Sequence, residues 1–359
     1  MRTMRALRKT GPGPGASLDE IPVPEPGEGE VLVRVHAASI CGTDLHIYDW
    51  NEWAQGRIPR TPMTFGHELA GVVEAVGPEV HHVQPGAFVA AETHISCGMC
   101  STCRTGRAHI CRNLRILGVD TDGAFAEYTI LPAANAWIVG EGIHPDHASI
   151  MEPFGNAVHA TFGTEGGEDL LTNPVAVIGC GPIGLFAVAI ARALGAWKVF
   201  AIEPNDERRT LAGKMGADLL IDPTDEDPVE VVLRETDGNG AEVVLEMSGN
   251  ARAIDQGTRM VARGGRVSLL GLPEGPVTLD LNDQVIFKEA RILGITGREM
   301  FRTWQQTTTL LSTGRVDVSP VITHRFPFDR FEEAFETAAS GHAAKVIMFP
   351  QAGAHAAGR

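Results

Sequence analysis

Apolar positions in the first part of the chain follow a period of two. Residues 31–35 show this alternation, and glycine and proline interrupt the apolar runs at residues 22–29, 77–78 and 85–86. Alternation over short runs is typical of strands, because successive side chains point to opposite faces of a sheet. The pattern predicts a β-rich domain over residues 1–154.

From about residue 155 the pattern changes to short apolar runs that alternate with longer helical ones. The expected strands are residues 175–178, 199–202, 219–221, 243–245, 267–270 and 292–295. The expected helices are residues 183–194, 207–215 and 251–261. Strand–helix alternation of this kind builds parallel βαβ units, so residues 155–296 are predicted to form a doubly wound parallel sheet and the fold class is α/β.

Residues 297–359 return to a mixed pattern. The stretches 301–311 and 331–339 predict amphipathic helices, and residues 346–349 predict a final strand. The tail at 351–359 is rich in alanine and glycine without periodicity and is predicted to be disordered.

Composition describes an ordinary globular protein and excludes some partners. The 359 residues are 43% apolar and 21% charged, and no run approaches the ~18 apolar residues of a membrane span. The basic first residues lack the apolar run of a signal peptide, so the cytoplasm is the expected compartment and no membrane partner is expected. A net charge of −15 argues against nucleic acid as a partner, because phosphate binding needs clustered lysine and arginine.

A glycine motif follows the expected strand at 175–178. Gly179, Gly181 and Gly184 have the spacing G-x-G-x-x-G and open the next helix. In this context the glycines permit a tight turn, a close approach of the backbone to a pyrophosphate, and close packing of helix on strand. We therefore predict a dinucleotide site; the alternative is a glycine turn in a domain that binds no nucleotide.

The residues after the second expected strand bear on the choice of cofactor. Glu203 is placed to accept hydrogen bonds from the ribose hydroxyls of adenosine and to repel a 2′-phosphate. Arg208 and Arg209 follow closely and offer positive charge to a phosphate. The acidic residue favours NAD over NADP.

Four of the six cysteines fall within one short segment. Cys97, Cys100, Cys103 and Cys111 offer four thiolates, enough to close a tetrahedral zinc site that fixes a loop and has no catalytic vacancy. An iron–sulfur cluster is the rival, because the first three have ferredoxin spacing, although the fourth does not continue that pattern. Disulfides are a third interpretation, which fits a long cytoplasmic chain less well.

A second set of metal-binding residue types is dispersed along the chain. It comprises Cys41, His67 and Glu68, with Glu152 farther on. Thiolate, imidazole and carboxylate together are the mixed set of an open catalytic zinc site, in which one position remains for water or substrate. Taken singly, the cysteine is also interpretable as a small core residue and the histidine as a hydrogen-bonded structural one.

The order of these motifs resembles the zinc-containing medium-chain dehydrogenase/reductase family. Residues 41–46, the step from Gly66 to Glu68, the four-cysteine segment and the glycine motif follow one another as in that family, over nearly the whole chain. The resemblance implies a GroES-like catalytic domain with a structural-zinc lobe at about 94–115, a Rossmann domain, and a C-terminal segment that completes the first domain. Their expected limits are 1–154, 155–296 and 297–359.

The resemblance also implies roles for single residues. Cys41, His67 and Glu68 are expected to ligate the catalytic zinc, and Glu152 to bind it or exchange at it. Thr43 and His46 are expected to relay the released proton; without the motif, a capping hydroxyl and a surface histidine are their ordinary interpretations. Further cofactor contacts are expected at Ile183, Arg208, Leu270, Gly271, Leu272, Ile295 and Thr296.

Five longer stretches are similar to the branch of this family that oxidises L-threonine. They are residues 41–53, 94–98, 152–159, 297–301 and 319–325. The resemblance implies oxidation of the secondary alcohol to 2-amino-3-oxobutyrate with hydride transfer to NAD, in a homo-oligomer for which a tetramer is favoured. His94 and Arg298 are then candidates for contacts with the amino-alcohol substrate.

Two alternative functions remain open. A dehydrogenase of polyols or vicinal diols, such as sorbitol or 2,3-butanediol, shares the zinc ligands. An NAD-binding regulatory or lens-type protein keeps the fold without the reaction, but it has no need of a complete ligand set. Some threonine-oxidising relatives carry aspartate where this chain has Glu152, which leaves open whether this carboxylate ligates zinc.

Overall fold

The computed structural model describes residues 2–351, which form two compact units. Unit 1 contains the residues up to Glu152, Glu299–Ser312 and the segment from Ile322 onwards. Unit 2 contains Pro153–Arg298 and Thr313–Val321. Apart from Gln351, the tail predicted at 351–359 lies outside the described residues.

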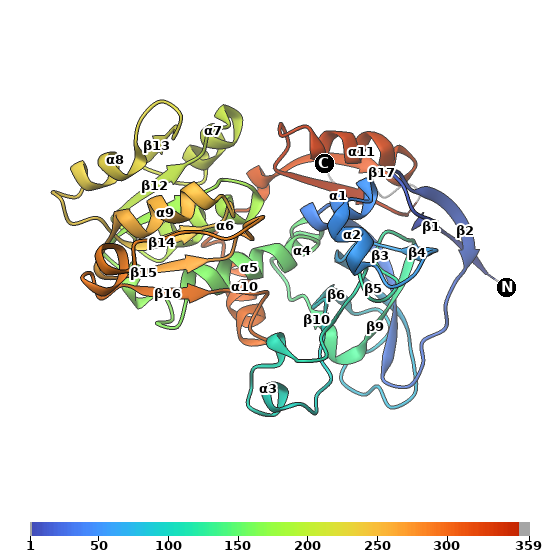
Figure 1. Cartoon of the computed structure of the whole chain (residues 1–359). Coiled ribbons are helices and arrows are strands. Elements are labelled where there is room, and N and C mark those ends of the chain that lie inside the picture. Colours follow the sequence, from blue (N-terminus) through green and yellow to red (C-terminus); the bar gives the residue numbers. More distant parts are fainter. Residues whose placement is uncertain (1, 352–359) are drawn as a thin grey trace. The chain divides into compact units, whose positions relative to one another are not determined.

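A seven-stranded sheet forms the body of unit 1 (Figure 1). Its strands are β3 (Glu30–Ser39), β5 (Glu68–Val76), β6 (Phe88–Ala91), β9 (Tyr128–Pro132), β10 (Ala136–Ile138), β17 (Ile322–Pro327) and β18 (Lys345–Phe349). The order is β10-β6-β5-β3-β18-β17, and β9 also pairs with β3. The alternation at residues 31–35 therefore correctly predicts part of β3.

Two smaller sheets and several helices surround this sheet. One sheet is built from β1 (Thr3–Lys9), β2 (Ser17–Pro22) and β4 (Met63–Thr64), the other from β7 (His94–Ile95) and β8 (Arg115–Ile116). The helices of unit 1 are α1 (Gly42–Asp49), α2 (Glu52–Arg57), α3 (Ser101–Arg104), α4 (Pro145–Ala148), α10 (Arg302–Ser312) and α11 (Phe331–Ala339). Short 3-10 turns are η1 (Ala108–Ile110), η2 (Ala133–Asn135) and η6 (Phe328–Arg330).

The core of unit 1 joins segments from both ends of the chain. The rings of Phe65, Phe125 and Phe335 lie with centroids 5.2, 5.8 and 5.9 Å apart, and all three side chains are buried. Phe335 belongs to α11, which packs on β17 and β18. Aromatic contacts of this kind hold α11, and with it the C-terminal strands β17 and β18, against the N-terminal part of unit 1.

A buried carboxylate on α4 links two strands of the same sheet. Asp146 lies 3.5 Å from Nε2 of His36 on β3 and accepts a hydrogen bond from Nε of Arg325 on β17 at 2.9 Å. Burial raises the pKa of Asp146, but the hydrogen bonds from His36 and Arg325 outweigh it and lower the pKa to about 2. The ionised form of Asp146 therefore stabilises unit 1.

Unit 2 is built on a six-stranded parallel sheet of order β13-β12-β11-β14-β15-β16. The strands are β11 (Pro174–Ile178), β12 (Lys198–Ile202), β13 (Leu219–Ile221), β14 (Ala241–Glu246), β15 (Val261–Leu269) and β16 (Arg291–Gly294). The chain adds strands in one direction from β11 to β13 and in the other from β14 to β16. The predicted doubly wound sheet is confirmed, and its order reverses between β11 and β14.

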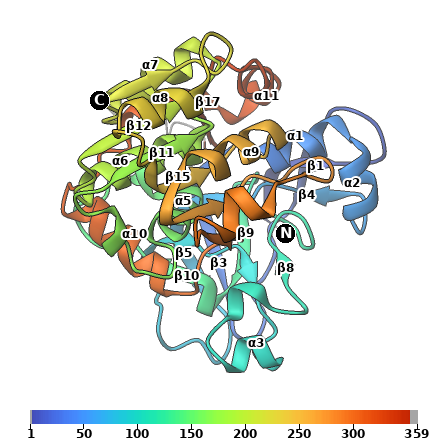
Figure 2. The same cartoon turned by 60° about the vertical axis from the view of Figure 1, so that its left-hand side comes forward.

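The helices of unit 2 cover both faces of this sheet. They are α5 (Met151–Phe162), α6 (Pro182–Ala193), α7 (Asp206–Lys214), α8 (Pro228–Arg234) and α9 (Ala251–Met260), with the short turns η3 (Glu168–Leu170), η4 (Asn282–Ile286) and η5 (Ser319–Val321). Figure 2 shows α6 and α9 on either side of the strands. Right-handed crossovers place the helices of each half of such a sheet on one face. Among the described residues, none of the helices has the length and apolar character that a membrane crossing requires.

Among the described residues, periodicity does not predict six of the helices, α1 to α5 and α8, and three of them show why. α1 and α8 span eight and seven residues, too few for a helical period to repeat clearly. α8 has a start signal all the same, because Oδ1 of Asp227 accepts a hydrogen bond from the N–H of Val229 at 2.9 Å. α5 contains Pro153 and Gly155, which disfavour a helix in isolation; its burial in the fold outweighs that preference.

Candidate active site

A cavity of about 540 Å³ opens at the carboxyl ends of β11, β12 and β14. Ile178 and Ile202 end β11 and β12, Met247 follows β14, and all three line the cavity. Doubly wound sheets bind ligands at this edge, where the strand order reverses. Four of the predicted cofactor residues line the cavity: Gly179, Gly181, Glu203 and Arg208.

Two glycines of the motif, Gly179 and Gly184, are required because a side chain there would collide with neighbouring atoms. Gly179 has a φ of +86°, and a Cβ there would lie 2.8 Å from Cβ of Ser248. A Cβ on Gly184 would lie 1.9 Å from the carbonyl oxygen of Gly179, so α6 starts this close to β11 only without a side chain. Gly181 differs, because it lines the cavity and a Cβ on it meets no other atom within 4 Å. The open space there fits a pyrophosphate that approaches the backbone.

Glu203 is fixed at the wall of the cavity. Its Oε2 accepts a hydrogen bond from the N–H of Cys180 at 2.7 Å, and its Oε1 accepts one from the N–H of Asn205 at 3.0 Å. Arg208 lines the cavity, and its buried Nε has no hydrogen-bond partner within residues 2–351. Arg209 donates instead to the backbone oxygen of Glu203 at 2.8 Å. Only one of the two arginines is thus available to a ligand in this cavity.

The turn after β14 belongs to the same cavity, although the glycine motif does not predict it. Met247, Ser248 and Asn250 line the cavity. The carboxylate of Glu246 holds the turn, because it accepts hydrogen bonds from the N–H groups of Ser248 at 2.8 Å and Gly249 at 3.0 Å. The sequence signal for this turn was the expected strand at 243–245 before it; that this strand lies beside residues 175–178 is known from the sheet order.

The other predicted cofactor residues do not line the cavity: Ile183, Gly184, Leu270, Gly271, Leu272, Ile295 and Thr296. The turn at 270–272 lies beside it, since a Cβ on Gly271 would be 2.0 Å from the backbone nitrogen of Gly249. The side chain of Leu272 is 89% exposed. Contacts of these residues with the cofactor stay a prediction.

Cys41, His67 and Glu68 lie together in unit 1, with their ligand atoms all within 4.8 Å of one another. Strand pairing brings them together, because Ser39 of β3 lies opposite Glu68 of β5. Cys41 follows β3, and His67 precedes β5. The sheet register therefore assembles a thiol, an imidazole and a carboxylate from distant parts of the chain.

Asp44, which is absent from the predicted residues, holds two members of this group. Its Oδ2 accepts a hydrogen bond from the N–H of Cys41 at 2.9 Å, and its Oδ1 lies 3.4 Å from Nδ1 of His67. Burial lowers the pKa of His67, but the charges of Asp44 and Cys41 outweigh burial and raise it well above its usual value. An acid three residues after a helix N-cap has capping-box spacing, so the sequence did carry a signal for Asp44.

Glu68 has partners from two other strands. Its Oε2 accepts hydrogen bonds from the hydroxyl of Ser39 and from Nζ of Lys345 at 2.5 Å. Nζ of Lys345 also donates to the carbonyl oxygen of Ile40 at 2.9 Å. Burial lowers the pKa of Lys345, but the negative charges of Glu68 and Cys41 outweigh it and raise the pKa.

The second oxygen of Glu68 supplies a test of whether these residues fit a metal ion. Oε1 is buried and has no hydrogen-bond partner in the described part of the chain. Buried polar atoms are nearly always paired, and an unpaired one is costly. A cation between this oxygen, the Cys41 sulfur and the His67 ring supplies the missing partner. The group therefore fits zinc, which prefers these ligand types.

Three further predicted site residues lie on helices. Glu152, in the first turn of α5, is buried but is not among the side chains whose ligand atoms converge within 4.8 Å. Thr43 and His46 stand three residues apart on α1 and share one side of the helix. His46 is exposed, and its Nδ1 lies 2.8 Å from Nδ2 of Asn51. Their role as a proton relay stays a prediction.

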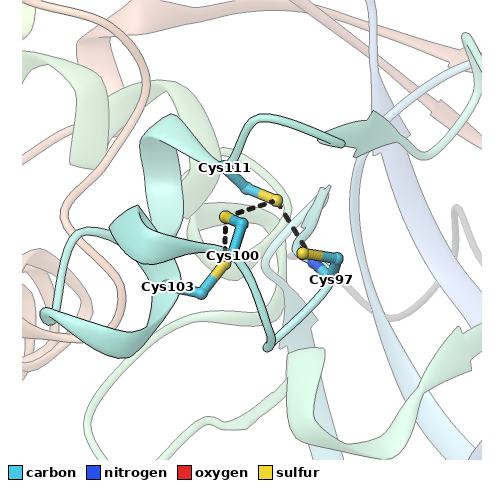
Figure 3. A group of neighbouring side chains, drawn as sticks. All are labelled: Cys97, Cys100, Cys103 and Cys111. Carbon is cyan, nitrogen blue, oxygen red and sulfur yellow. Dashed lines mark hydrogen bonds between the residues drawn. The ribbon is translucent and has the colours of Figure 1, made fainter.

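The four clustered cysteines converge on one point (Figure 3). All four sulfur atoms lie within 4.8 Å of one another, and none of them forms a disulfide. A tetrahedral zinc with bonds of about 2.3 Å places its sulfurs roughly 3.8 Å apart, whereas a cluster with its own sulfide ions holds them farther apart. The spacing fits a single zinc ion better than an iron–sulfur cluster.

The thiols of Cys100 and Cys103 in this lobe differ in pKa, because their hydrogen bonds and the effect of burial differ. The hydroxyl of Thr102 and the N–H groups of Cys103 and Arg112 lower the pKa of the Cys100 thiol to about 5. Burial and the neighbouring sulfurs raise the pKa of Cys103 to about 12. A bound cation reverses the second effect, because coordination deprotonates a thiol.

The two predicted substrate residues belong to different units. The N–H of His94 donates to Oε1 of Glu92 at 2.8 Å, and Oε2 of Glu92 accepts from the indole of Trp304 at 2.6 Å. Arg298 is buried, and its Nη1 donates to Oδ1 of Asn156 at 2.9 Å. Contacts of His94 and Arg298 with a substrate stay predictions.

Comparison with known proteins relates both sites to one family. The family described as alcohol dehydrogenase GroES-like domain matches residues 27–141, and the family described as zinc-binding dehydrogenase matches residues 182–313. The chain belongs to the zinc-binding alcohol dehydrogenases. The predicted family, fold class and cofactors, zinc and NAD, are confirmed, and the chain is an NAD-dependent zinc dehydrogenase.

Individual members of this family are similar over nearly their full length. L-threonine 3-dehydrogenase of Bacillus subtilis is 51% identical over 349 residues, which cover 97% of this chain and 99% of the relative. L-threonine 3-dehydrogenase of Pyrococcus horikoshii is 50% identical over 347 residues, which cover 96% and 98%. A solved zinc-binding dehydrogenase of Sinorhizobium meliloti, bound to NADP, has a TM-score of 0.89 at 32% identity and covers 98% of this chain and 100% of its own.

Proposed function

We propose that this chain oxidises the secondary alcohol of L-threonine to 2-amino-3-oxobutyrate and transfers the hydride to NAD. The observation that carries the proposal is the 51% and 50% identity to two L-threonine 3-dehydrogenases over nearly all of both chains. The converging Cys41, His67 and Glu68 support a catalytic rather than a regulatory protein, since a protein without the reaction has no need of them.

Zinc, when bound, acts as a Lewis acid on the alcohol oxygen. In this proposal Cys41, His67 and Glu68 hold the ion. The carboxylate of Asp44 faces Nδ1 of His67 as an ion-pair partner, which leaves Nε2 for the metal, and Lys345 pairs with Oε2 of Glu68, which leaves Oε1.

Oxidation of the alcohol removes one hydride and one proton. A bound NAD would supply the nicotinamide ring as the acceptor of the hydride. The proton leaves through the hydroxyl of Thr43, which both accepts and donates, and then through the imidazole of His46, whose exposure allows release to water. Glu152 binds the zinc or exchanges at it as a mobile acid.

The cavity at the carboxyl ends of β11, β12 and β14 binds NAD in this proposal. Gly179, Gly181 and Gly184 allow the pyrophosphate to approach the backbone, and Glu203 accepts hydrogen bonds from the ribose hydroxyls. A carboxylate has about four acceptor positions, so its two backbone bonds leave room for these. Arg208 contacts the adenosine part, and the remaining contacts come from Ile183, Leu270, Gly271, Leu272, Ile295 and Thr296.

Substrate charge supplies the reason for two further assignments. Threonine carries a carboxylate and an ammonium beside its reacting alcohol. Arg298 is assigned to the carboxylate, and His94 or Glu152 to the ammonium. The four-cysteine lobe holds a second, structural zinc in this proposal. The proposed domain limits are 1–154 for the catalytic domain, 155–296 for the Rossmann domain and 297–359 for the C-terminal segment.

We also propose a cytoplasmic homo-oligomer, with a tetramer favoured. β16 is an edge strand, and large apolar side chains in or just before it are exposed: Leu281, Ile286, Phe287 and Ile292. An open edge with exposed apolar residues favours association. Analytical ultracentrifugation tests this, and Phe287→Glu should shift the mass towards the monomer.

Steady-state rates with L-threonine, sorbitol and 2,3-butanediol test the main proposal. We expect kcat/KM to be highest for threonine, with production of NADH. A preference for sorbitol or 2,3-butanediol favours the polyol alternative, and inactivity of the zinc-loaded chain towards all three alcohols contradicts the catalytic role.

A further inference from the structure

A second cavity, of about 400 Å³, lies in unit 1. Its lining includes none of the metal-ligating residues and none of the nucleotide-cavity residues. It opens between the β1–β2 hairpin and β9, and its wall is mixed: the apolar part consists mainly of Met4, Ile21, Ile95, Tyr128 and Ile130, and the rest is charged or carries hydroxyl groups. The volume falls in the range of small-molecule sites, about 300–1,000 Å³.

The carboxylates that line this cavity are occupied within the protein. Asp122 accepts hydrogen bonds from the N–H of Thr64 at 2.9 Å and from Nη2 of Arg60 at 2.8 Å. Glu30 accepts one from the N–H of Gly27 at 2.9 Å. Neither acid therefore neutralises the two other arginines that line the cavity, Arg8 and Arg115.

Two other polar side chains of the lining, Arg8 and Thr121, have a polar atom for which the described residues supply no hydrogen-bond partner. Nε of Arg8 and Oγ1 of Thr121 are buried atoms with no hydrogen-bond partner in residues 2–351. The nearest acid to Arg8, Asp19, lies 3.9 Å from Nη1, beyond hydrogen-bond distance. Because buried polar atoms are nearly always paired, two unpaired ones on one cavity indicate a missing acceptor.

We propose that this cavity binds a small organic monoanion, with a carboxylate on an apolar body. The carboxylate accepts hydrogen bonds from Nε of Arg8 and the hydroxyl of Thr121 and faces the charge of Arg115. The lining holds three arginines and two acids, which leaves one net positive charge and favours a monoanion over a phosphate dianion. The apolar body rests on Met4 and its apolar neighbours in the wall.

Isothermal titration calorimetry with 4-phenylbutyrate and its uncharged amide, 4-phenylbutyramide, tests the site on the zinc-loaded full chain. We expect the carboxylate to bind about tenfold more tightly than the amide, and Arg8→Gln to weaken carboxylate binding by about tenfold. Thr121→Val should weaken it by less. The matched control is Arg315→Gln, at an exposed arginine of unit 2, and should change nothing. Saturating threonine and NADH should leave the affinity unchanged.

Several results overturn the proposal. One is the absence of binding at millimolar concentration, and another is equal binding of acid and amide. Binding that survives Arg8→Gln shows that Arg8 is not the anchor, and displacement by threonine places the carboxylate on the metal group instead. A cooperative thermal melt checks that Arg8→Gln folds; if it does not, the acid–amide comparison and Thr121→Val decide. Because calorimetry requires no turnover, failure here is distinct from failure of threonine oxidation.

Discussion

Replacing Lys345 by methionine tests whether the Glu68 carboxylate depends on a buried counter-charge. Nζ of Lys345 lies 2.5 Å from Oε2 of Glu68, and the two side chains are 3% and 0% exposed. Methionine fills most of the same space, so the main loss is the charge, and the hydroxyl of Ser39 remains as a donor to the carboxylate. Removing one partner of a buried ion pair typically costs about 3–5 kcal/mol.

Bound zinc should reduce this loss. Without zinc, the cation left beside Glu68 in the variant is the protonated His67, whose ligand atom lies within 4.8 Å of the carboxylate, whereas with zinc Oε1 of Glu68 has the metal in our proposal. At 2–4 °C per kcal/mol for a unit of this size, we expect Tm to fall by about 6–20 °C after chelation. The fall should be smaller with zinc bound. Lys214→Met, at an exposed lysine of α7, is the matched control and should change Tm little.

Thermal melts of the single variants and of a double variant, with and without chelator, measure the coupling. Glu68→Gln should recover part of the loss caused by Lys345→Met, because a neutral amide needs no counter-charge, so the two effects are not additive. The reasoning is refuted if chelated Lys345→Met melts like the control variant. It is also refuted if the double variant loses the sum of the two single losses.

Three further predictions concern zinc, cofactor and pH. Elemental analysis should find two zinc ions per chain; Cys111→Ser should lose one together with stability, and Cys41→Ser should abolish turnover in a chain that still melts cooperatively. Equal unfolding in both variants contradicts this division. Glu203→Ala should raise kcat/KM with NADP by about tenfold or more, because a charge next to the 2′-phosphate is removed; a native preference for NADP contradicts it. Asp146→Asn should lower the free energy of unfolding at pH 7 by about 1–2 kcal/mol after allowance for solvent screening. The folded-state pKa of Asp146, about 2, lies below the unfolded value of about 3.9, so the difference should be full above pH 4 and shrink as pH falls towards 2. Urea unfolding at pH 7 and pH 3 measures it, and a difference that grows on acidification contradicts the sign.

The nucleotide cavity was largely predictable because its determinants are local. An apolar run, three spaced glycines and an acid after the next strand define the turn at Gly179, the open approach at Gly181 and the position of Glu203. The missing part, the turn at 247–250, comes from a strand that joins β11 through a long crossover. Its position depends on sheet order, which periodicity alone does not give.

The metal group was predictable in its ligands but not in their support. Cys41, His67 and Glu68 are recognisable by residue type and motif, whereas Lys345 lies in an apolar strand near the other end of the chain. It reaches Glu68 because β18 pairs with β3, where Met348 lies opposite Ala38. Such a contact has no local signal, since it exists only after two distant strands have found their register.

Charge around the metal group bears on the choice between an amino alcohol and a polyol. Cys41 as a thiolate, together with the carboxylates of Asp44 and Glu68, supplies negative charge, and the charge of Glu152 also acts on Lys345. Lys345 contributes one positive charge and a bound zinc two, so one negative charge remains in a buried region where charges interact strongly. An ammonium group beside the reacting alcohol balances that charge, and sorbitol or 2,3-butanediol has none to offer. The negative charge that the ligands Cys41 and Glu68 share with Asp44 and Glu152 is therefore a physical reason for an ammonium-bearing substrate, beside the sequence likeness.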